Sequence, residues 1–154
     1  MIYAAENRKS EKYYTFLPKL FDVTGNAQLK YNWLITACEC NVANRIEDAY
    51  FAKGYCWISG EELAAIVREN EIQWIWAILS GFEKDIPLEK VLEHPCPDFT
   101  DGEEICGIIH PLAKVQIIAF DSSKIQFFCT DAKLISKFRI GYPQSDDIND
   151  DSVK

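Results

Sequence analysis

The amino-acid sequence predicts a single α+β domain. We expect one largely antiparallel sheet of four to five strands, with two to three helices packed mainly on one of its faces. Three stretches carry this prediction. "LKYNWLIT" alternates apolar and polar side chains, "SGEELAAIVREN" has the spacing of an amphipathic helix, and "KVQIIAFDSSKIQFFCTD" has the outline of a hairpin. Strands and helices in mixed order are typical of this fold class.

The first third of the chain predicts one strand after an interrupted amphipathic stretch. Residues Ser10–Phe21 carry apolar side chains in places, but Pro18 interrupts any helix there. A turn is expected at Thr24–Gln28, because its glycine and asparagine tolerate turn conformations. The alternating strand occupies Leu29–Thr36. The polar stretch of residues 41–54 is either a short helix or an irregular excursion.

The clearest local signal in the chain is a helix that begins after Ser59. The Ser59 side chain can cap the first turn while Glu62 reaches back, which is the pattern of a capping box. Leu63, Ile66 and Val67 then form an apolar stripe, and the helix is expected to end near Asn70. The short strand "YCWI" precedes this helix.

The stretch "IQWIWAILSGF" predicts a central strand that is covered on both faces. It is rich in isoleucine and tryptophan, and Gln73 is its only polar residue before Ser80. Trp74 and Trp76 are two residues apart and are therefore expected to share one face of the strand. We expect both rings in the core. The alternative is that they form an exposed platform for a ligand.

The following elements are a short helix, an acidic loop and a hairpin. The helix reads "DIPLEKVLEH", with Pro87 near its start, and the loop reads "PCPDFTDGEE". The hairpin joins a strand at Val115–Phe120 to a strand at Ile125–Cys129 through a turn at Asp121–Lys124.

A second capped helix is expected at the end of the domain. Thr130 or Asp131 can cap its first turn, and Gly141 followed by Pro143 ends it. We expect residues 1–143 to form the domain. Residues 144–154 contain four aspartates and predict an acidic, flexible tail.

Length and charge limit the classes of function. The chain has 154 residues, 24 acidic and 16 basic, and a formal net charge of −8. This charge argues against general binding to nucleic acid or to anionic membranes and suits a basic partner, although solubility alone could explain it. The sequence shows no signal peptide and no apolar run as long as a membrane span. The six cysteines have irregular spacing, so we expect reduced thiols in a cytoplasmic protein.

The sequence favours a protein that is not an enzyme. It has two histidines and none of the common catalytic motifs. The alternative is a small zinc protein or enzyme built on His94, Cys96, Cys106 and His110, since zinc takes four such ligands. Only one residue separates His94 from Cys96, which is closer than paired zinc ligands usually lie. We therefore predict no metal, no other cofactor and no catalytic residues.

Acidic residues are the candidate partner-binding residues. Asp98, Asp101, Glu103 and Glu104 lie in one loop that contains no lysine or arginine, and loops often carry function. Asp121 in the hairpin turn joins them as a candidate, although its carboxylate could instead accept hydrogen bonds from the turn. Such a surface could dock on a basic groove. The alternative for the whole set is a solvated loop.

Several strings resemble a group of small acidic bacterial proteins, some of them similar to immunity proteins, which neutralise toxins. These strings are "TGNAQLKYNWLI", "ISGEEL", "WIWAILSGF", "AFDSS" and "KLISKFRIGYPQSDD". The resemblance implies an inhibitor that binds one cognate toxin domain, with a basic active-site surface if that toxin is a nuclease. It brings no catalytic residues. A further alternative is a neutral protein partner reached through exposed aromatic side chains, namely Tyr13, Tyr14 and Phe16.

Overall fold

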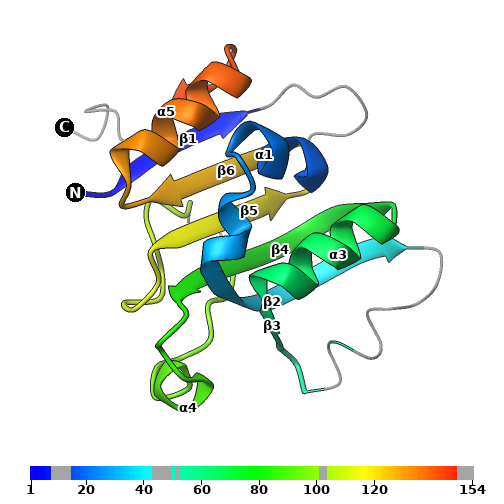
Figure 1. The fold of residues 1–154 in the computed structure, drawn as a ribbon, viewed down its shortest axis with the longest axis vertical. Coiled ribbons are helices and arrows are strands. Elements are labelled where there is room, and N and C mark those ends of the chain that lie inside the picture. The colour runs from blue at the N-terminus through cyan, green and yellow to red at the C-terminus, as the bar shows by residue number, and fades with distance from the viewer. Residues whose placement is uncertain (8–14, 43–49, 51–52, 101–103, 149–154) are drawn as a thin grey trace.

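One antiparallel β-sheet forms the centre of the molecule (Figure 1). The structure is a computed structural model that describes residues 1–7, 15–42, 50, 53–100 and 104–148. The sheet has seven strands in the order β3-β2-β4-β5-β6-β1-β7, which is more than the four to five predicted. All neighbouring strands are antiparallel. The strands are β1 (Tyr3–Asn7), β2 (Tyr31–Val42), β3 (Cys56–Ser59), β4 (Ile72–Glu83), β5 (Val115–Phe120), β6 (Lys124–Cys129) and β7 (Asp146–Asp147).

Three of the four described α-helices lie on one face of this sheet, which agrees with the predicted packing mainly on one face, although two to three helices in all were predicted. Figure 1 shows α1, α3 and α5 in front of the strands and α4 beyond one end of the sheet. The helices are α1 (Leu17–Val23), α3 (Gly60–Glu69), α4 (Leu88–Val91) and α5 (Ala132–Gly141), with a short 3-10 helix η1 (Ala27–Lys30) before β2. In the described ranges, none of these helices has both the length and the apolar character needed to cross a membrane.

Two helices begin with the N-cap side chains that the sequence predicts, Ser59 and Asp131. The Ser59 hydroxyl accepts a hydrogen bond from the N–H of Glu62 at 3.1 Å, and the Asp131 carboxylate accepts one from the N–H of Lys133 at 2.8 Å. The expectation for Pro18 is wrong. Pro18 lies in the first turn of α1, where its missing N–H leaves no hydrogen bond unmade, so it starts a helix instead of interrupting one.

The main core lies between the sheet and the three helices. It contains the side chains of Trp33, Trp74, Leu63 and Phe138, all at most 4% exposed. The ring of Phe138 on α5 stacks on Phe127 of β6 with 5.1 Å between the centroids. This core fixes each helix by its apolar stripe, because buried apolar area is the main favourable term in folding.

The opposite face of the sheet is covered by the connection between α4 and β5. Its described part, residues 92–100 and 104–114, packs apolar side chains on two smaller clusters, one around Ile78 and Ile118 and the other around Leu34 and Phe82. The strand β4 is therefore covered on both faces, as predicted for the central strand.

Two strands of the sheet are absent from the sequence prediction. β1 inserts between β6 and β7, and β7 comes from the stretch predicted as a flexible tail. Residues 144–148 leave α5 and return to the sheet, where Asp147 pairs with Arg139 at 2.8 Å and Ile148 packs on the cluster around Ile78. Several predictions fall outside the described residues. They concern Asp101, Glu103, Tyr13, Tyr14, most of the polar stretch at 41–54, and residues 149–154.

Candidate partner-binding surface

A β-bulge places Trp74 and Trp76 on opposite faces of the sheet. Thr36 pairs with Ile78, but Glu39 pairs with Trp76 and Cys40 with Trp74, so the register shifts twice within a few residues. Each extra residue in a bulge changes the alternation of side chains. Trp74 therefore lies in the main core, whereas Trp76 contacts rings on the other face. The prediction that both tryptophans share one face is wrong for this reason.

The bulge brings Trp76 into a row of four side chains that crosses four strands. Glu39 of β2 lies opposite Trp76 of β4, Trp76 lies opposite Phe120 of β5, and Phe120 lies opposite Lys124 of β6. Residues directly opposite each other in antiparallel strands project from the same face. The row therefore runs acid, aromatic, aromatic, base across the face that is not covered by the helices.

The two rings of this row form an aromatic cluster with a third ring from the acidic loop. Trp76 makes edge-to-face contacts with Phe120 at 4.7 Å and with Phe99 at 5.2 Å, measured between ring centroids. All three side chains are only half-buried. Edge-to-face geometry is a favourable arrangement for aromatic pairs, so the loop is fixed to the sheet at this point.

The basic end of the row is neutralised within the molecule. The Lys124 ammonium lies 3.2 Å from a carboxylate oxygen of Glu6 and 3.7 Å from one of Glu104, and 4.7 Å above the centre of the Phe120 ring. The amide of Gln126 donates a further hydrogen bond to Glu6 at 3.4 Å. Lys124 is 9% exposed, so its charge is directed to these internal partners.

The structure brings three of the predicted acidic residues to this row. Asp98 precedes Phe99 and accepts a hydrogen bond from the N–H of that residue at 2.8 Å. Glu104 reaches Lys124, as described above. Asp121 directly follows Phe120 in the hairpin turn. The other two candidates, Asp101 and Glu103, lie outside the described residues.

The hairpin turn that carries Asp121 is fixed to the bulge. Asp121 and Ser122 have positive φ angles of 51° and 54°, which is the conformation of a tight hairpin turn. The N–H of Ser122 donates to the carbonyl oxygen of Ile75 at 3.1 Å, and the amide of Gln73 donates to the Ser122 hydroxyl at 3.2 Å. The position of Asp121 relative to Trp76 is therefore set by hydrogen bonds from β4.

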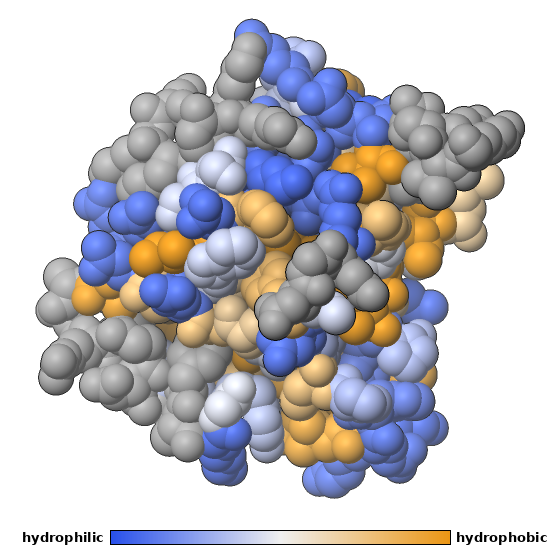
Figure 2. All heavy atoms as spheres, turned by 180° about the vertical axis from the view of Figure 1, so that it is seen from behind, coloured by the Kyte–Doolittle hydropathy of each residue, from blue (hydrophilic) through white to orange (hydrophobic). Residues whose placement is uncertain are grey.

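We call this arrangement the aromatic–acidic surface. It consists of Glu39, Trp76, Asp98, Phe99, Glu104, Phe120, Asp121 and Lys124. Figure 2 shows the face that carries it, where hydrophobic side chains lie in several patches between hydrophilic ones. Glu39, Asp98, Glu104 and Asp121 are exposed, so carboxylates surround half-buried rings. Such a surface suits a guanidinium or ammonium group, which can stack on a ring and pair with a carboxylate.

Five of these residues are not among the partner-binding residues predicted from the sequence. They are Glu39, Trp76, Phe99, Phe120 and Lys124. Strand alternation alone predicts that Trp76 lies on the same face of the sheet as Trp74. Only the register of three strands and the bulge show that it belongs with Glu39 and Phe120.

The alternative zinc site is not assembled. In the described part of the chain, no group of three or more histidine, cysteine, aspartate or glutamate side chains could hold a metal ion. The Nε2–H of His110 donates to the carbonyl oxygen of Val91 at 2.9 Å, and Nδ1 accepts from the N–H of Leu112 at 3.2 Å. Both ring nitrogens are therefore occupied by the backbone. Burial lowers the pKa of His110, which agrees with a neutral ring.

The buried cysteines are unsuited to nucleophilic chemistry. Burial is the main cause that raises the pKa of the Cys56 thiol to about 12 and that of the Cys129 thiol to about 11. Both groups are therefore protonated at neutral pH, and the thiol is a much weaker nucleophile than the thiolate. None of the six cysteines, all of which lie in the described ranges, forms a disulfide, and Cys96 and Cys106 are exposed.

Comparisons with known proteins find no match to this chain. No family model, no curated protein and no solved structure matches this chain. The resemblance to immunity proteins therefore stays a prediction, and a role for the aromatic–acidic surface has to be inferred from its chemistry.

Proposed function

We propose that this chain is an immunity-type protein that binds a cognate toxin domain and neutralises it without turnover. The supporting observation is the aromatic–acidic surface, in which exposed carboxylates surround the half-buried rings of Trp76, Phe99 and Phe120. Aromatic residues are enriched at the centres of protein interfaces, and rings flanked by carboxylates suit the arginines of a basic partner. On this proposal the protein acts in the cytoplasm.

The surface has the features of a preformed interface. Its rings hold one another, and its turn is hydrogen-bonded to the bulge, so few side chains would have to be ordered on binding. The net charge of −8 would speed association with a basic toxin and make the association rate sensitive to salt. If the toxin has a basic catalytic surface, such as that of a nuclease, binding of the aromatic–acidic surface to it would block catalysis.

The experiment compares the wild-type chain with two variants of the surface in the cells from which the sequence comes. Trp76→Ala removes the central ring, and Glu39→Lys reverses one charge of the row. Asp85→Lys is the matched control for charge, because Asp85 is exposed in the turn after β4, at the other end of that strand. We expect the wild type and Asp85→Lys to bind the same basic protein in these cells.

Neutralisation is tested separately from binding. The captured protein, expressed alone, should arrest growth, and co-expression of the wild-type chain should restore it. Trp76→Ala should weaken the complex by at least about 2 kcal/mol, or roughly thirtyfold, and should fail to restore growth. Equal binding by Trp76→Ala and the wild type would contradict this use of the surface. A partner that is harmless when expressed alone would contradict the immunity function.

A further inference from the structure

A small internal cavity lies in the main core, between α1 and the sheet. Its walls come from α1 and the residue after it, from η1 and α5, and from the strands β2, β5 and β6. Ten of the eleven lining residues are at most 8% exposed, so the cavity is enclosed by protein. Its volume is about 10 Å³, which is close to the space that one water molecule needs.

Gln28 brings a hydrogen-bond acceptor without a partner to the wall of this cavity. Its side chain is 3% exposed. The Oε1 atom is fully buried and accepts no hydrogen bond from the described residues. A buried acceptor without a donor costs free energy, and native proteins satisfy such atoms with protein groups or with ordered water.

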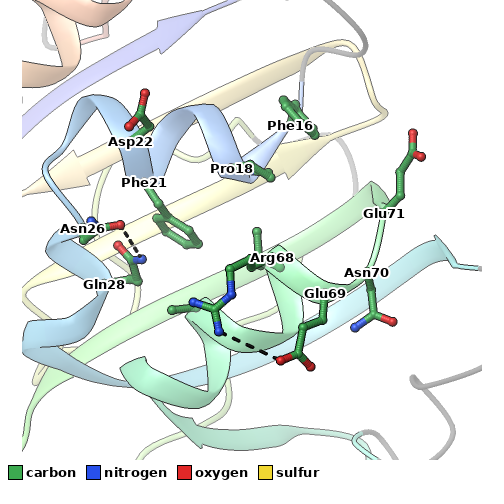
Figure 3. Close-up of a pocket in the computed structure, with 12 residues that line it drawn as sticks. Phe16, Pro18, Phe21, Asp22, Asn26, Gln28, Arg68, Glu69, Asn70 and Glu71 are labelled. Atoms are coloured by element: carbon green, nitrogen blue, oxygen red, sulfur yellow. Dashed lines mark hydrogen bonds and ion pairs between the residues drawn. The ribbon is translucent and has the colours of Figure 1, made fainter.

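The other end of the same amide shows the direction in which Oε1 points. Nε2 donates to Asn26 Oδ1 at 3.3 Å, as the dashed line in Figure 3 shows. Asn26 lines the surface groove between α1 and α3 but not the cavity, whereas Gln28 lines both. The nitrogen and the oxygen of an amide project in different directions from one carbon atom. Nε2 therefore lies toward the groove, and the fully buried Oε1 lies toward the cavity.

Thr24 supplies a second polar group in the cavity wall. Its hydroxyl donates to the carbonyl oxygen of Leu20 at 2.8 Å, and the oxygen can still accept a hydrogen bond. The indole N–H of Trp33 is already used, because it donates to the backbone carbonyl of Gln28 at 3.0 Å. Tyr31, the remaining polar side chain of the lining, makes no hydrogen bond to Oε1. The cavity thus has two acceptors that a donor between them could satisfy.

We infer that one water molecule is bound in this cavity, where it donates one hydrogen bond to Gln28 Oε1 and the other to Thr24 Oγ1. The volume admits a single water, and two polar partners are enough to hold it. Such a bridge is nearly as favourable in enthalpy as a direct hydrogen bond. It fixes the residue at which η1, β2 and α3 meet, because the Gln28 carbonyl also lies against Gly60. The site does not depend on the proposed function.

The first test is a crystal structure of the full chain at a resolution that shows ordered water. We expect one density peak inside the cavity, within hydrogen-bond distance of both Gln28 Oε1 and Thr24 Oγ1. A cavity without such a peak would overturn the inference. A protein N–H or O–H that donates to Oε1 in place of water would overturn it as well.

Oxygen-17 relaxation dispersion of the full chain tests the site in solution, because it counts internal water molecules that exchange slowly. Gln28→Met keeps the approximate volume of the side chain and removes the acceptor, so it should hold one slowly exchanging water fewer than the wild type. Gln126→Met is the control. It also removes a buried amide, but Gln126 faces Ile118 on the other side of the sheet and does not line the cavity. Equal counts in the wild type and Gln28→Met would overturn the inference.

A pair of variants at Thr24 tests the second partner, and thermal melts show that each variant is folded. Thr24→Val replaces the hydroxyl by a methyl group of similar size and leaves the water with one partner, so the slowly exchanging water should be lost. Thr24→Ser keeps the hydroxyl and should keep the water. A Thr24→Val variant that holds the water as the wild type does would overturn the bridge between Gln28 and Thr24.

Discussion

The side-chain amide of Gln116 donates a hydrogen bond to the carbonyl oxygen of Gly107 at 2.9 Å. Its oxygen accepts a second hydrogen bond, from the N–H of Ile109 at 2.8 Å. Gln116 is a fully buried residue of β5, so one amide holds the loop on the sheet in the way that a neighbouring strand would. This pair of hydrogen bonds keeps the connection that covers the second face in place.

Replacing Gln116 by leucine should destabilise the protein. The change leaves the N–H of Ile109 and the carbonyl of Gly107 without their partner, and we expect the free energy of unfolding to fall by about 2–3 kcal/mol. Urea denaturation measures this loss, and amide exchange should show faster exchange at Ile109. Gln144→Leu makes the same change at an exposed position and should have little effect. A loss as small as that of Gln144→Leu would contradict the role of the amide.

Acid should destabilise the fold through His110. Burial lowers the pKa of His110 below its ordinary value of 6.5 in the folded protein, so the unfolded chain binds the proton more readily. The contribution of the neutral His110 ring to the free energy of unfolding is present above pH 6.5 and is lost as the pH falls below that value. Protonation would also break the hydrogen bond from Leu112 to Nδ1.

The measurement is the free energy of unfolding of the wild type and of His110→Gln between pH 5 and pH 8, a window chosen around the ordinary histidine pKa. The difference between the two should shrink as the pH falls. His94→Gln controls for the second histidine, which lies 5.2 Å from His110 between ring centroids. A difference that does not vary with pH would show that His110 does not carry the acid sensitivity.

Removing the charge of Lys124 should destabilise the protein, because it takes away the ammonium that lies beside the carboxylates of Glu6 and Glu104. The side chains of Lys124 and Glu6 are only 11% and 12% exposed, so Lys124→Met should cost about 2–4 kcal/mol of stability. The double variant Lys124→Met, Glu6→Gln should recover part of this loss, because the buried side chain at position 6 is then neutral and no longer needs the ammonium. Chemical denaturation of the two single variants and the double variant measures the coupling. Additive losses would contradict a direct interaction.

A methyl group at Gly60 should be strongly destabilising, although alanine favours helices. A Cβ atom there would lie 2.0 Å from the carbonyl oxygen of Gln28, and backbone in η1 cannot move away as a flexible side chain can. We expect Gly60→Ala to cost about 3 kcal/mol, measured by thermal or urea denaturation. Gly107→Ala is the control, since nothing lies within 4 Å of the added Cβ. Similar stabilities of the two variants would contradict the close packing of α3 on η1.

Local chemistry made much of the fold predictable. The caps at Ser59 and Asp131 depend on residues a few positions apart, and the hairpin of β5 and β6 is set by alternation and a short turn. The two strands that sequence reasoning missed have weak patterns. β1 reads "YAAEN", with small and polar residues, and β7 consists of Asp146 and Asp147. Both are strands because of their neighbours in the sheet and not because of their own propensity.

The candidate surface was predictable only in part. The acidic loop could be recognised in the sequence as a cluster of carboxylates. Asp98 and Glu104 of this loop do lie beside the aromatic rings of the surface. Trp76 could not be placed, because alternation assumes an unbroken register and the bulge changes it. The row from Glu39 to Lys124 depends on the register of four strands at once, and a pattern read along one segment does not contain that register.

The place of β1 in the sheet sets the order in which the molecule can be completed. Glu6 and Gln126 face each other in neighbouring strands although 120 residues separate them in the chain. During synthesis, β1 leaves the ribosome long before its partner β6 exists, so it has to wait unpaired while β2 to β5 form their local pairings. Pairing of β1 with β6, and not formation of the central strands, should therefore be the slow folding step of a newly made chain.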